Sequence, residues 1–274
     1  MTHVNQPVDH PYEDSAGDFL ELASEQRLAI IQKLLVKKSK LSLLAKELDA
    51  TPPEVFRNLE RLEKAGMIMK NASGEYNLTI CGHIICTSLI PSLDFISRNK
   101  TFFKDHDFGE IPQKFIQRIG ALTSGELVSG FTRVIEKWQD IFENSNEYIL
   151  GILVEEPLEV IEPLIKKAKK GIKVNSIFSE SAIIPKRRTE ILQKLGVEKL
   201  IQDGVIERKM KKDVKVVVVL NEKEACVNFP TKKGEPDISK MFCSTDPLFH
   251  EWCLDYFRYW WYDSEYFQES KLKK

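Results

Sequence analysis

The chain has 274 residues, of which 42% are hydrophobic and 30% are charged, and its formal net charge is −1. This length suits two domains with separate cores, and the near-neutral charge excludes a uniformly basic nucleic-acid coat protein. No apolar run approaches the roughly 20 residues that a membrane span needs, and no signal-peptide core is found at the N-terminus. We therefore expect a cytoplasmic globular protein without a membrane anchor.

Residues 1–17 are polar, contain two prolines and show no hydrophobic periodicity, which predicts a disordered lead. From Asp18 to Lys38 apolar residues recur at helical spacing. Ser24 interrupts this pattern and is a suitable N-cap for a second helix. We expect this segment to be the scaffold that packs behind the next two helices.

Residues 41–66 predict a short helix, a tight turn and a second helix. The first helix carries one apolar stripe, which breaks at residues 49–50. Thr51, two prolines and then Glu54 form a strong signal for the start of the second helix. This arrangement is a helix-turn-helix, in which the second helix lies in the DNA major groove.

The second helix is expected to bury Val55, Leu59, Leu62 and Phe56 and to turn its cationic, amide-bearing face outward. Between Arg27 and Lys70 there are ten Lys or Arg and five Asp or Glu, a local net charge of +5. Phosphate contacts need such an excess, although lysine-rich solvated helices produce it too. The predicted DNA contacts at this helix are Thr51, Pro53, Glu54, Arg57, Asn58 and Arg61.

Two short β-prone runs, at residues 67–70 and 75–79, flank Asn-Ala-Ser-Gly, which is typical of a hairpin turn. A hairpin that follows a recognition helix is a wing, so Lys70 and Asn71 complete the predicted DNA contacts. The order of elements predicts a winged helix-turn-helix domain over residues 18–79.

Residues 80–97 are strongly apolar and contain Pro91. Eighteen residues are few for a membrane span, and His83, Ser92 and Asp94 interrupt the run. We expect a kinked helix buried against other protein, which serves as a connector and dimer helix over residues 80–100.

The second half alternates strand and helix patterns, which predicts an α/β domain with a mixed sheet over residues 101–265 and a tail over 266–274. The whole chain is thus expected to be an α+β winged helix, a connector helix and a C-terminal α/β domain. The expected strands are 148–155, 172–178, 207–210, 214–220 and 224–229, and the expected helices are 112–122, 130–144, 157–170, 185–195 and 246–262.

Catalytic signals are few, since the chain has no GxSxG, HExxH or P-loop motif and no GxGxxG in a βαβ context. His250 and Cys253 would need further ligands to hold a metal, so a structural role is favoured. We expect no catalytic residues, no metal and no cofactor. The five cysteines lack a CxxC pair, which predicts free, mostly buried thiols in a reducing cytosol, with a redox sensor at Cys81 and Cys86 as the alternative. They are Cys81, Cys86, Cys226, Cys243 and Cys253.

Several longer motifs point to one family. They are Thr101-Phe102-Phe103, His106-Asp107-Phe108-Gly109-Glu110-Ile111-Pro112, Gly125-Glu126-Leu127, Gly151-Ile152-Leu153, Lys173-Val174-Asn175-Ser176-Ile177-Phe178 and Asp246-Pro247-Leu248-Phe249-His250-Glu251-Trp252-Cys253. Through these motifs, residues 18–265 resemble archaeal winged-helix transcriptional regulators that carry the middle domain of methanogenesis regulatory proteins. The family domain is similar in outline to regulatory domains that look like non-catalytic phospholipase-D halves. That enzyme motif needs a His, and the comparable stretch here, Glu207 to Asp213, has none.

We therefore expect a homodimeric regulator that binds double-stranded DNA, with a non-catalytic sensing domain. The alternatives are a winged-helix protein-interaction factor of the transcription machinery and a phosphodiesterase-like enzyme. Because open α/β sheets bind ligands at the carboxyl ends of their strands, a small-molecule effector is expected there. Arg187, Arg188 and Lys209 to Lys212 are candidates to receive an anionic effector, although a solvated basic face is the favoured interpretation. The predicted effector pocket comprises Glu155, Glu156, Ser179, Glu180, Trp252 and Tyr256. For the aromatic residues of the last helix, packing in the core or at an interface is the favoured alternative.

Overall fold

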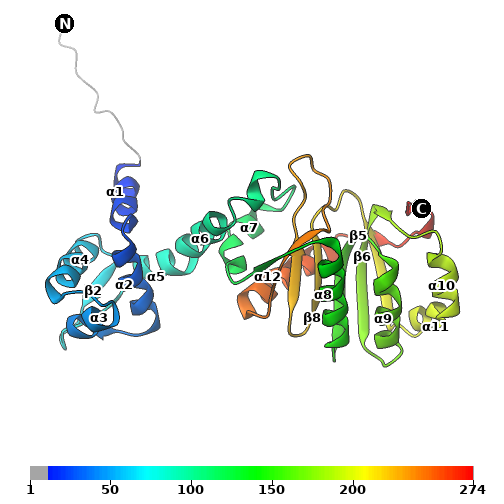
Figure 1. The fold of residues 1–274 in the computed structure, drawn as a ribbon, viewed down its shortest axis with the longest axis horizontal. Helices are drawn as coiled ribbons and strands as arrows, with labels where there is room; N and C mark the ends of the chain where they lie inside the picture. Colours follow the sequence, from blue (N-terminus) through cyan, green and yellow to red (C-terminus); the bar gives the residue numbers. More distant parts are fainter. Residues whose placement is uncertain (1–11, 274) are drawn as a thin grey trace, which may run out of the picture. The chain divides into compact units, whose positions relative to one another are not determined.

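The computed structural model describes residues 12–273 and divides into two compact units, unit 1 (Met1–Pro91) and unit 2 (Ser92–Lys274). Figure 1 shows that unit 1 consists mainly of helices, whereas unit 2 is built around a large sheet. The predicted disordered lead lies partly outside the described residues. The prediction of disorder is wrong for residues 13–17, because helix α1 (Glu13–Leu22) begins there. Glu13 and Asp14 lie in its first turn, where negative charge stabilises a helix.

Unit 1 continues with three further helices, α2 (Glu25–Val36), α3 (Leu41–Glu47) and α4 (Pro52–Lys64). Strands β1 (Ser39–Lys40), β2 (Ile68–Lys70) and β3 (Glu75–Leu78) form an antiparallel sheet in the order β1-β3-β2. Helices and sheet share one core. Its most deeply buried side chains include Ile30, Ile31, Leu44, Val55, Leu59, Leu62 and Met67.

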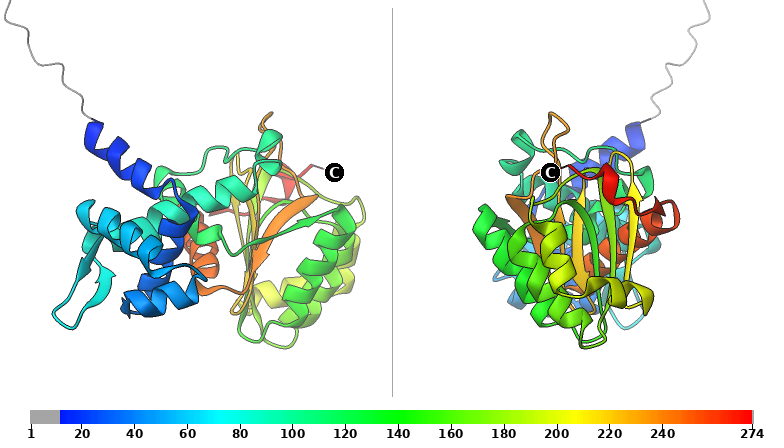
Figure 2. Two further views of the ribbon diagram at one scale, coloured as in Figure 1. Left: turned by 60° about the vertical axis from the view of Figure 1, so that its left-hand side comes forward. Right: turned by 90° about the vertical axis from the view of Figure 1, so that its right-hand side faces the viewer.

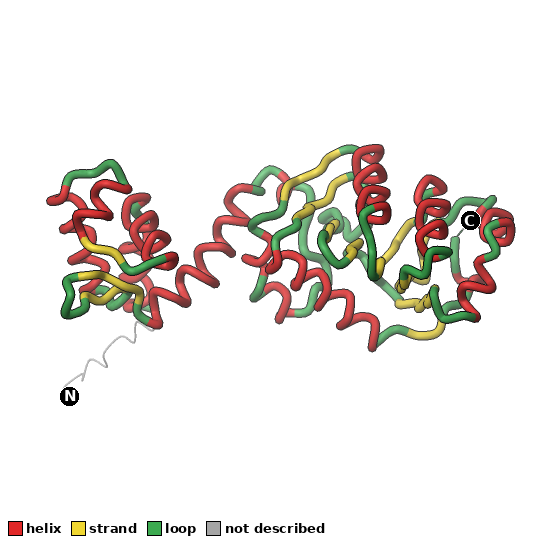
Figure 3. Tube along the Cα trace, turned by 90° about the horizontal axis from the view of Figure 1, so that it is seen from below, coloured by secondary structure: helices red, strands yellow, loops and turns green. Residues whose placement is uncertain are grey.

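A single run of helix covers residues 80–98, and Figure 3 shows it as a continuous helical tube. It consists of α5 (Ile80–Ile84), the π turn η1 (Ile85–Leu89) and α6 (Ile90–Arg98). Pro91 has no N–H to donate to the preceding turn, and the helix widens into the π turn directly before it. The run is long and apolar enough to cross a membrane, and 22% of it is buried. The expected burial is therefore only partial, since Ile80, Ile84 and Leu93 are exposed.

Unit 2 contains an eight-stranded mixed sheet, which confirms the expected mixed sheet in the C-terminal half. The strands lie in the order β11-β7-β6-β5-β8-β9-β10-β4, and β5, β6 and β7 are parallel to one another. The bounds are β4 (Glu126–Ser129), β5 (Tyr148–Glu155), β6 (Lys173–Ile183), β7 (Ile206–Lys211), β8 (Val217–Asn221), β9 (Ala225–Asn228), β10 (Lys240–Ser244) and β11 (Glu265–Tyr266).

Helices cover both faces of this sheet, which explains why every residue of β8 is buried. Figure 2 shows α8 and α9 on one face and α12 on the other. The expected helix at 112–122 is instead the short α7 followed by a 3₁₀ turn, Ile119–Leu122. The helices are α7 (Gln113–Ile116), α8 (Phe131–Glu143), α9 (Leu158–Ala168), α10 (Arg188–Lys194), α11 (Val197–Gln202) and α12 (Pro247–Tyr262).

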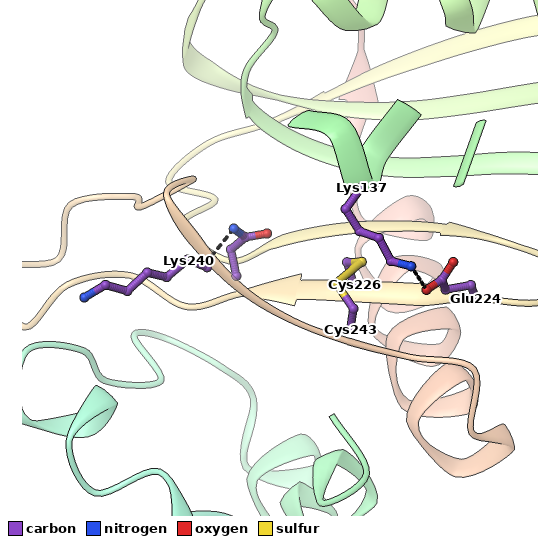
Figure 4. Close-up of a disulfide and its surroundings, with 6 residues drawn as sticks. Lys137, Glu224, Cys226, Lys240 and Cys243 are labelled. Carbon is purple, nitrogen blue, oxygen red and sulfur yellow. Dashed lines mark hydrogen bonds and ion pairs between the residues drawn. A yellow bond between two sulfur atoms is a disulfide. The ribbon is translucent and has the colours of Figure 1, made fainter. Parts of the chain in front are cut away.

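A disulfide joins Cys226 in β9 to Cys243 in β10, with a Cα–Cα distance of 4.2 Å (Figure 4). The prediction of five free thiols is therefore wrong for this pair and holds for Cys81, Cys86 and Cys253. The two cysteines are direct partners in the antiparallel ladder. Strand register places them together, and their spacing in the sequence carries no sign of that register. Burial raises the pKa of the Cys86 thiol to about 11, which disfavours the reactive thiolate.

Candidate nucleic-acid interface

Helix α4 packs into unit 1 through Val55, Leu59 and Leu62, which are completely buried. Its N-terminal turn, from Pro52 to Glu54, is exposed. Phe56 is 43% exposed, so its predicted burial is wrong. The helical periodicity thus predicted burial correctly at three of the four positions. Phe56 lies next to the buried stripe and not within it. An aromatic side chain is thus available on the exposed surface of α4.

The start of α4 is held by two hydrogen bonds that Thr51 donates to Glu54. The hydroxyl of Thr51 donates to the Glu54 carboxylate at 2.7 Å, and the Thr51 backbone N–H donates to it at 3.0 Å. The hydroxyl hydrogen bond, followed by the backbone one, lowers the pKa of Glu54. Both predicted DNA contacts therefore have a role in starting the helix, as the sequence signal indicates.

Arg57 is an exposed cation in the first half of α4. Its guanidinium forms no hydrogen bond or ion pair with any of residues 12–273, although its charge contributes to the lowered pKa of Glu54. Pro53 beside it is also exposed. Of the charged and amide side chains predicted to contact DNA on α4, Arg57 is the one that could reach a ligand without breaking a hydrogen bond or ion pair to a described residue.

Asn58 and Arg61 are on the same helix but contact α1 and α2. The amide nitrogen of Asn58 donates to the side chain of Gln26 and to the Glu54 carbonyl, and its oxygen accepts from Arg27 at 3.4 Å. Arg61 donates from Nε and Nη2 to the carboxylate of Glu21, each at 2.8 Å. Sequence periodicity could not reveal these contacts, because they depend on where α1 packs. To contact DNA as predicted, Asn58 and Arg61 would have to break some of these hydrogen bonds and form new ones with the duplex.

The turn between β2 and β3 is shaped by Asn71. Its side-chain oxygen accepts from the backbone N–H groups of Ser73 and Glu75 at 3.0 and 2.9 Å. Gly74 has a φ of 78°, which glycine adopts without strain. Asn71 therefore organises the turn, while Lys70 is exposed with its ammonium 5.4 Å from the ring centre of Tyr76. Of the two residues predicted at the hairpin, Lys70 is the one with an accessible charge.

Half of the ten cations between residues 27 and 70 form ion pairs within unit 1. Lys33 and Lys37 pair with Glu47, and Lys38 pairs with Glu75. Arg27 and Arg61 pair with Glu21. The other five form no ion pair with a described residue. They are Lys40, Lys46, Arg57, Lys64 and Lys70, and all are exposed.

In unit 2, the carboxylates predicted to line an effector pocket are largely bound by other side chains. The Glu156 carboxylate is buried and pairs with Arg188, and Glu180 pairs with Lys271 at 2.6 Å. Ser179 is buried and its hydroxyl lies 3.1 Å from that of Ser181. Glu155 is half-buried, and burial raises the pKa of its carboxyl.

Trp252 and Tyr256 are core residues and do not close that pocket, so this part of the prediction is wrong. Trp252 is fully buried, stacks on Tyr256 and donates from Nε1 to the Phe115 carbonyl at 3.1 Å. Burial also raises the pKa of the Tyr256 phenol. These two aromatic side chains pack α12 against Phe115, which is the more ordinary role for an aromatic stripe.

Comparison with known proteins finds no matching family model and no matching curated protein. Among solved structures, TrmBL2, an archaeal chromatin protein, is 14% identical and aligns over 93% of this chain and 100% of its own, with a TM-score of 0.40. Nuc from Salmonella typhimurium, a phospholipase D family member, is 12% identical over 53% of this chain and 99% of its own, with a TM-score of 0.38. NucT from Helicobacter pylori is 13% identical over 52% of this chain and 98% of its own, with a TM-score of 0.40. Similarities of this size assign neither a family nor a function.

Proposed function

We propose that this protein is a DNA-binding transcriptional regulator whose unit 1 is a winged helix-turn-helix. The observation that carries this proposal is the exposed N-terminal half of α4, where the guanidinium of Arg57 forms no ion pair with a described residue. Helix α3 precedes α4 across a tight turn in which Asp49 has a φ of 47°. The β2–β3 hairpin follows directly after α4. In helix-turn-helix proteins this succession of elements places the second helix in the DNA major groove, which supports the proposal.

The exposed lysines that form no ion pair with a described residue support phosphate contacts by other elements of unit 1. Lys40 lies in β1, Lys46 in α3 and Lys70 in β2, so three other elements of unit 1 each contribute one. Each cation that neutralises a phosphate releases counterions, which makes binding weaken with rising salt. Arg57 would then supply the contact to a base edge, and the lysines would fix the position on the backbone.

Our proposal includes a homodimer in which the helix at residues 80–98 forms part of the interface. Ile80, Ile84 and Leu93 leave apolar side chains exposed on this helix, with exposed fractions of 81%, 59% and 53%. A second copy of the same helix is the simplest cover for such a surface, because most soluble homo-oligomers are symmetric dimers. It also includes a cytoplasmic location and a unit 2 that senses a small molecule without converting it.

A second candidate is a protein-interaction factor of the transcription machinery. Helix α4 carries three acidic and three basic residues, so its net charge is zero, and Phe56 is exposed on it. A neutral helix with an exposed aromatic residue also suits a protein partner. Both candidates use the same surface, and they differ in how binding responds to salt and to DNA sequence.

Genomic SELEX with the full chain, followed by fluorescence-anisotropy titrations from 50 to 200 mM salt, separates these candidates. The regulator should enrich related sequences, and its affinity should fall by orders of magnitude over this range if six or more phosphates are contacted. Absence of enrichment together with salt-independent or undetectable DNA binding would favour the protein-interaction factor. A parallel phosphodiesterase assay checks the non-catalytic role of unit 2.

A further inference from the structure

The last described residues of the chain, 263–273, lie across the parallel part of the unit 2 sheet. Strand β11 adds to the edge of β7, pairing Glu265 with Met210. Further along, the N–H of Lys273 donates to the Ala182 carbonyl at 2.9 Å, and the N–H of Ile184 donates to the Lys273 carbonyl at 2.8 Å. This C-terminal segment therefore covers the end of β6, where the sequence predicts an open effector pocket.

The C-terminal segment brings one carboxylate, that of Glu269, to two arginines. Arg188 donates from Nη1 to Oε1 of Glu269 at 2.6 Å, and Nη1 of Arg208 lies 3.7 Å from Oε2. The Arg188 side chain is 1% exposed and that of Arg208 is 19% exposed, whereas Glu269 is 41% exposed. A partly exposed carboxylate from the chain end thus divides its two oxygens between two guanidinium groups.

Arg208 is the less well neutralised of these two cations. Arg188 has its own buried carboxylate, Glu156, while Glu269 is the one ion-pair partner of Arg208 among residues 12–273. Burial, and next the charge of Arg188, lowers the pKa of Arg208. Its guanidinium also stacks 4.2 Å from the ring centre of Phe267. A partly desolvated cation with one shared, long ion pair is electrostatically suited to a further anion.

A cavity of about 210 Å³ opens beside this pair, and both Arg208 and Glu269 line it. Its walls include the apolar side chains of Leu192, Val197 and Ile201 from α10 and α11. Thr189 adds a hydroxyl. Gln193 and a second carboxylate, that of Glu198, also line it. The cavity thus sets one cation and two carboxylates on an otherwise apolar wall, and a few polar groups on such a wall fix the orientation of a small amphiphilic ligand.

We propose that this cavity binds a small organic anion, a carboxylate or phosphate monoester with a compact apolar group, and that Glu269 occupies the place of the anion until it arrives. The anionic oxygens contact Arg208, with Arg188 beside it, and the apolar group lies against α10 and α11. Binding itself is independent of the proposed function. Only its consequence for DNA rests on the proposed sensing role of unit 2.

Titration calorimetry on the full chain, at constant ionic strength, tests this site with phenyl phosphate and benzoate as probes and benzyl alcohol as the neutral control. We expect saturable binding of an anionic probe and none of benzyl alcohol. Glu269→Gln should tighten that binding about tenfold, because it removes a charged competitor from the arginines. Lys194→Gln, which alters an exposed lysine of α10 paired with Glu190, is the matched control and should change nothing.

Arg208→Gln should weaken binding at least tenfold. Arg208→Lys keeps the charge and should bind with intermediate affinity, and it serves as the test if the Gln variant does not fold by circular dichroism. Equal affinity in the wild type and either folded Arg208 variant would overturn the site, as would no effect of Glu269→Gln. Failure of both anions to bind the wild type and Glu269→Gln proteins would also overturn it.

Titrations of the SELEX-selected DNA with and without saturating probe then separate the two proposals. Probe binding with unchanged DNA affinity leaves the anion site intact and removes the sensing role. A change in DNA affinity that Arg208→Lys diminishes supports both. If no DNA is bound at all, the regulator fails while the calorimetric result for the cavity stands.

Discussion

At the scale of single residues, Arg57 offers the sharpest test of the α4 surface. Arg57→Ala should cost about 1–3 kcal/mol against the preferred site if the guanidinium contacts a guanine, and preference at that position should relax. Anisotropy titrations against the selected site and its single-base variants measure this. Lys64→Ala, an exposed cation at the other end of α4, is the matched control and should not change base preference.

Equal weakening of Arg57→Ala on every sequence would instead assign the side chain to a phosphate. No weakening on any duplex would remove α4 as the recognition helix.

The Arg61–Glu21 pair makes a second residue-scale prediction. The hydrogen bond from Arg61 lowers the pKa of Glu21, so the pair stabilises the fold above the unfolded-state pKa of about 4.3 and loses this contribution as pH falls through the lower folded-state pKa. Arg61 is 55% exposed, so solvent screens the pair and its stabilisation of the fold is small. Glu21→Gln should therefore unfold at nearly the wild-type urea concentration.

The same substitution should release Arg61 toward DNA. Glu21→Gln is expected to bind duplexes more tightly at 50 mM salt and to raise the salt slope by about one. Asp14→Asn, an exposed acid in the same helix, controls for the general loss of negative charge. If the two variants behave alike, Arg61 is a structural residue of α4 and not a DNA contact.

At the scale of elements, the β2–β3 hairpin should act through charge. Lys70→Ala is expected to weaken binding to all duplexes and to lower the salt slope by about one, because one phosphate contact is lost. Lys37→Ala is a suitable control, since Lys37 already pairs with Glu47. An unchanged slope for Lys70→Ala would place the hairpin away from DNA.

The disulfide between β9 and β10 makes a prediction about stability. It closes a loop with a sequence separation of 17, for which loop-closure entropy gives about 3 kcal/mol. Urea unfolding of the oxidised protein should therefore show a higher midpoint than that of Cys226→Ser/Cys243→Ser. Cys81→Ser, which changes an exposed free thiol, should match the wild type. Identical midpoints for the double variant and the oxidised wild type would contradict a stabilising bridge.

The sequence pattern predicted structure correctly where residues a few positions apart in the chain determine it. The Thr51–Glu54 contact and the buried stripe of α4 follow from spacing within one helix. Features that depend on distant packing were missed, namely the binding of Arg61 by α1 and the joining of Cys226 to Cys243. Trp252 and Tyr256 were misplaced for the same reason, since an aromatic stripe does not reveal which neighbour it faces. The effector pocket likewise depends on a chain end whose position the sequence does not give.

At the scale of the whole molecule, the helix at residues 80–98 should control assembly. Its exposed isoleucines at positions 80 and 84 are one helical turn apart, so they share one face. In a symmetric dimer this face would meet its own copy, and a carboxylate there would be buried against apolar surface at a large cost. Ile84→Glu should therefore shift the protein from dimer to monomer. Val36→Glu, at a position in α2 that is 84% exposed, is the matched control and should leave the dimer intact.

Multi-angle light scattering at micromolar concentration measures this directly, with 31.6 kDa expected for a monomer. A dimeric regulator also constrains its operator, because two winged helices related by a two-fold axis require two half-sites of opposite orientation. The SELEX-selected sequence should then be a pseudo-palindrome with half-site centres about one helical turn apart, or a multiple of it. The Ile84→Glu monomer should retain the half-site preference of Arg57 but lose the added affinity of the second half-site. A wild-type protein that remains monomeric while binding a single unrepeated site would rule out the dimer and leave α4 as the complete determinant of recognition.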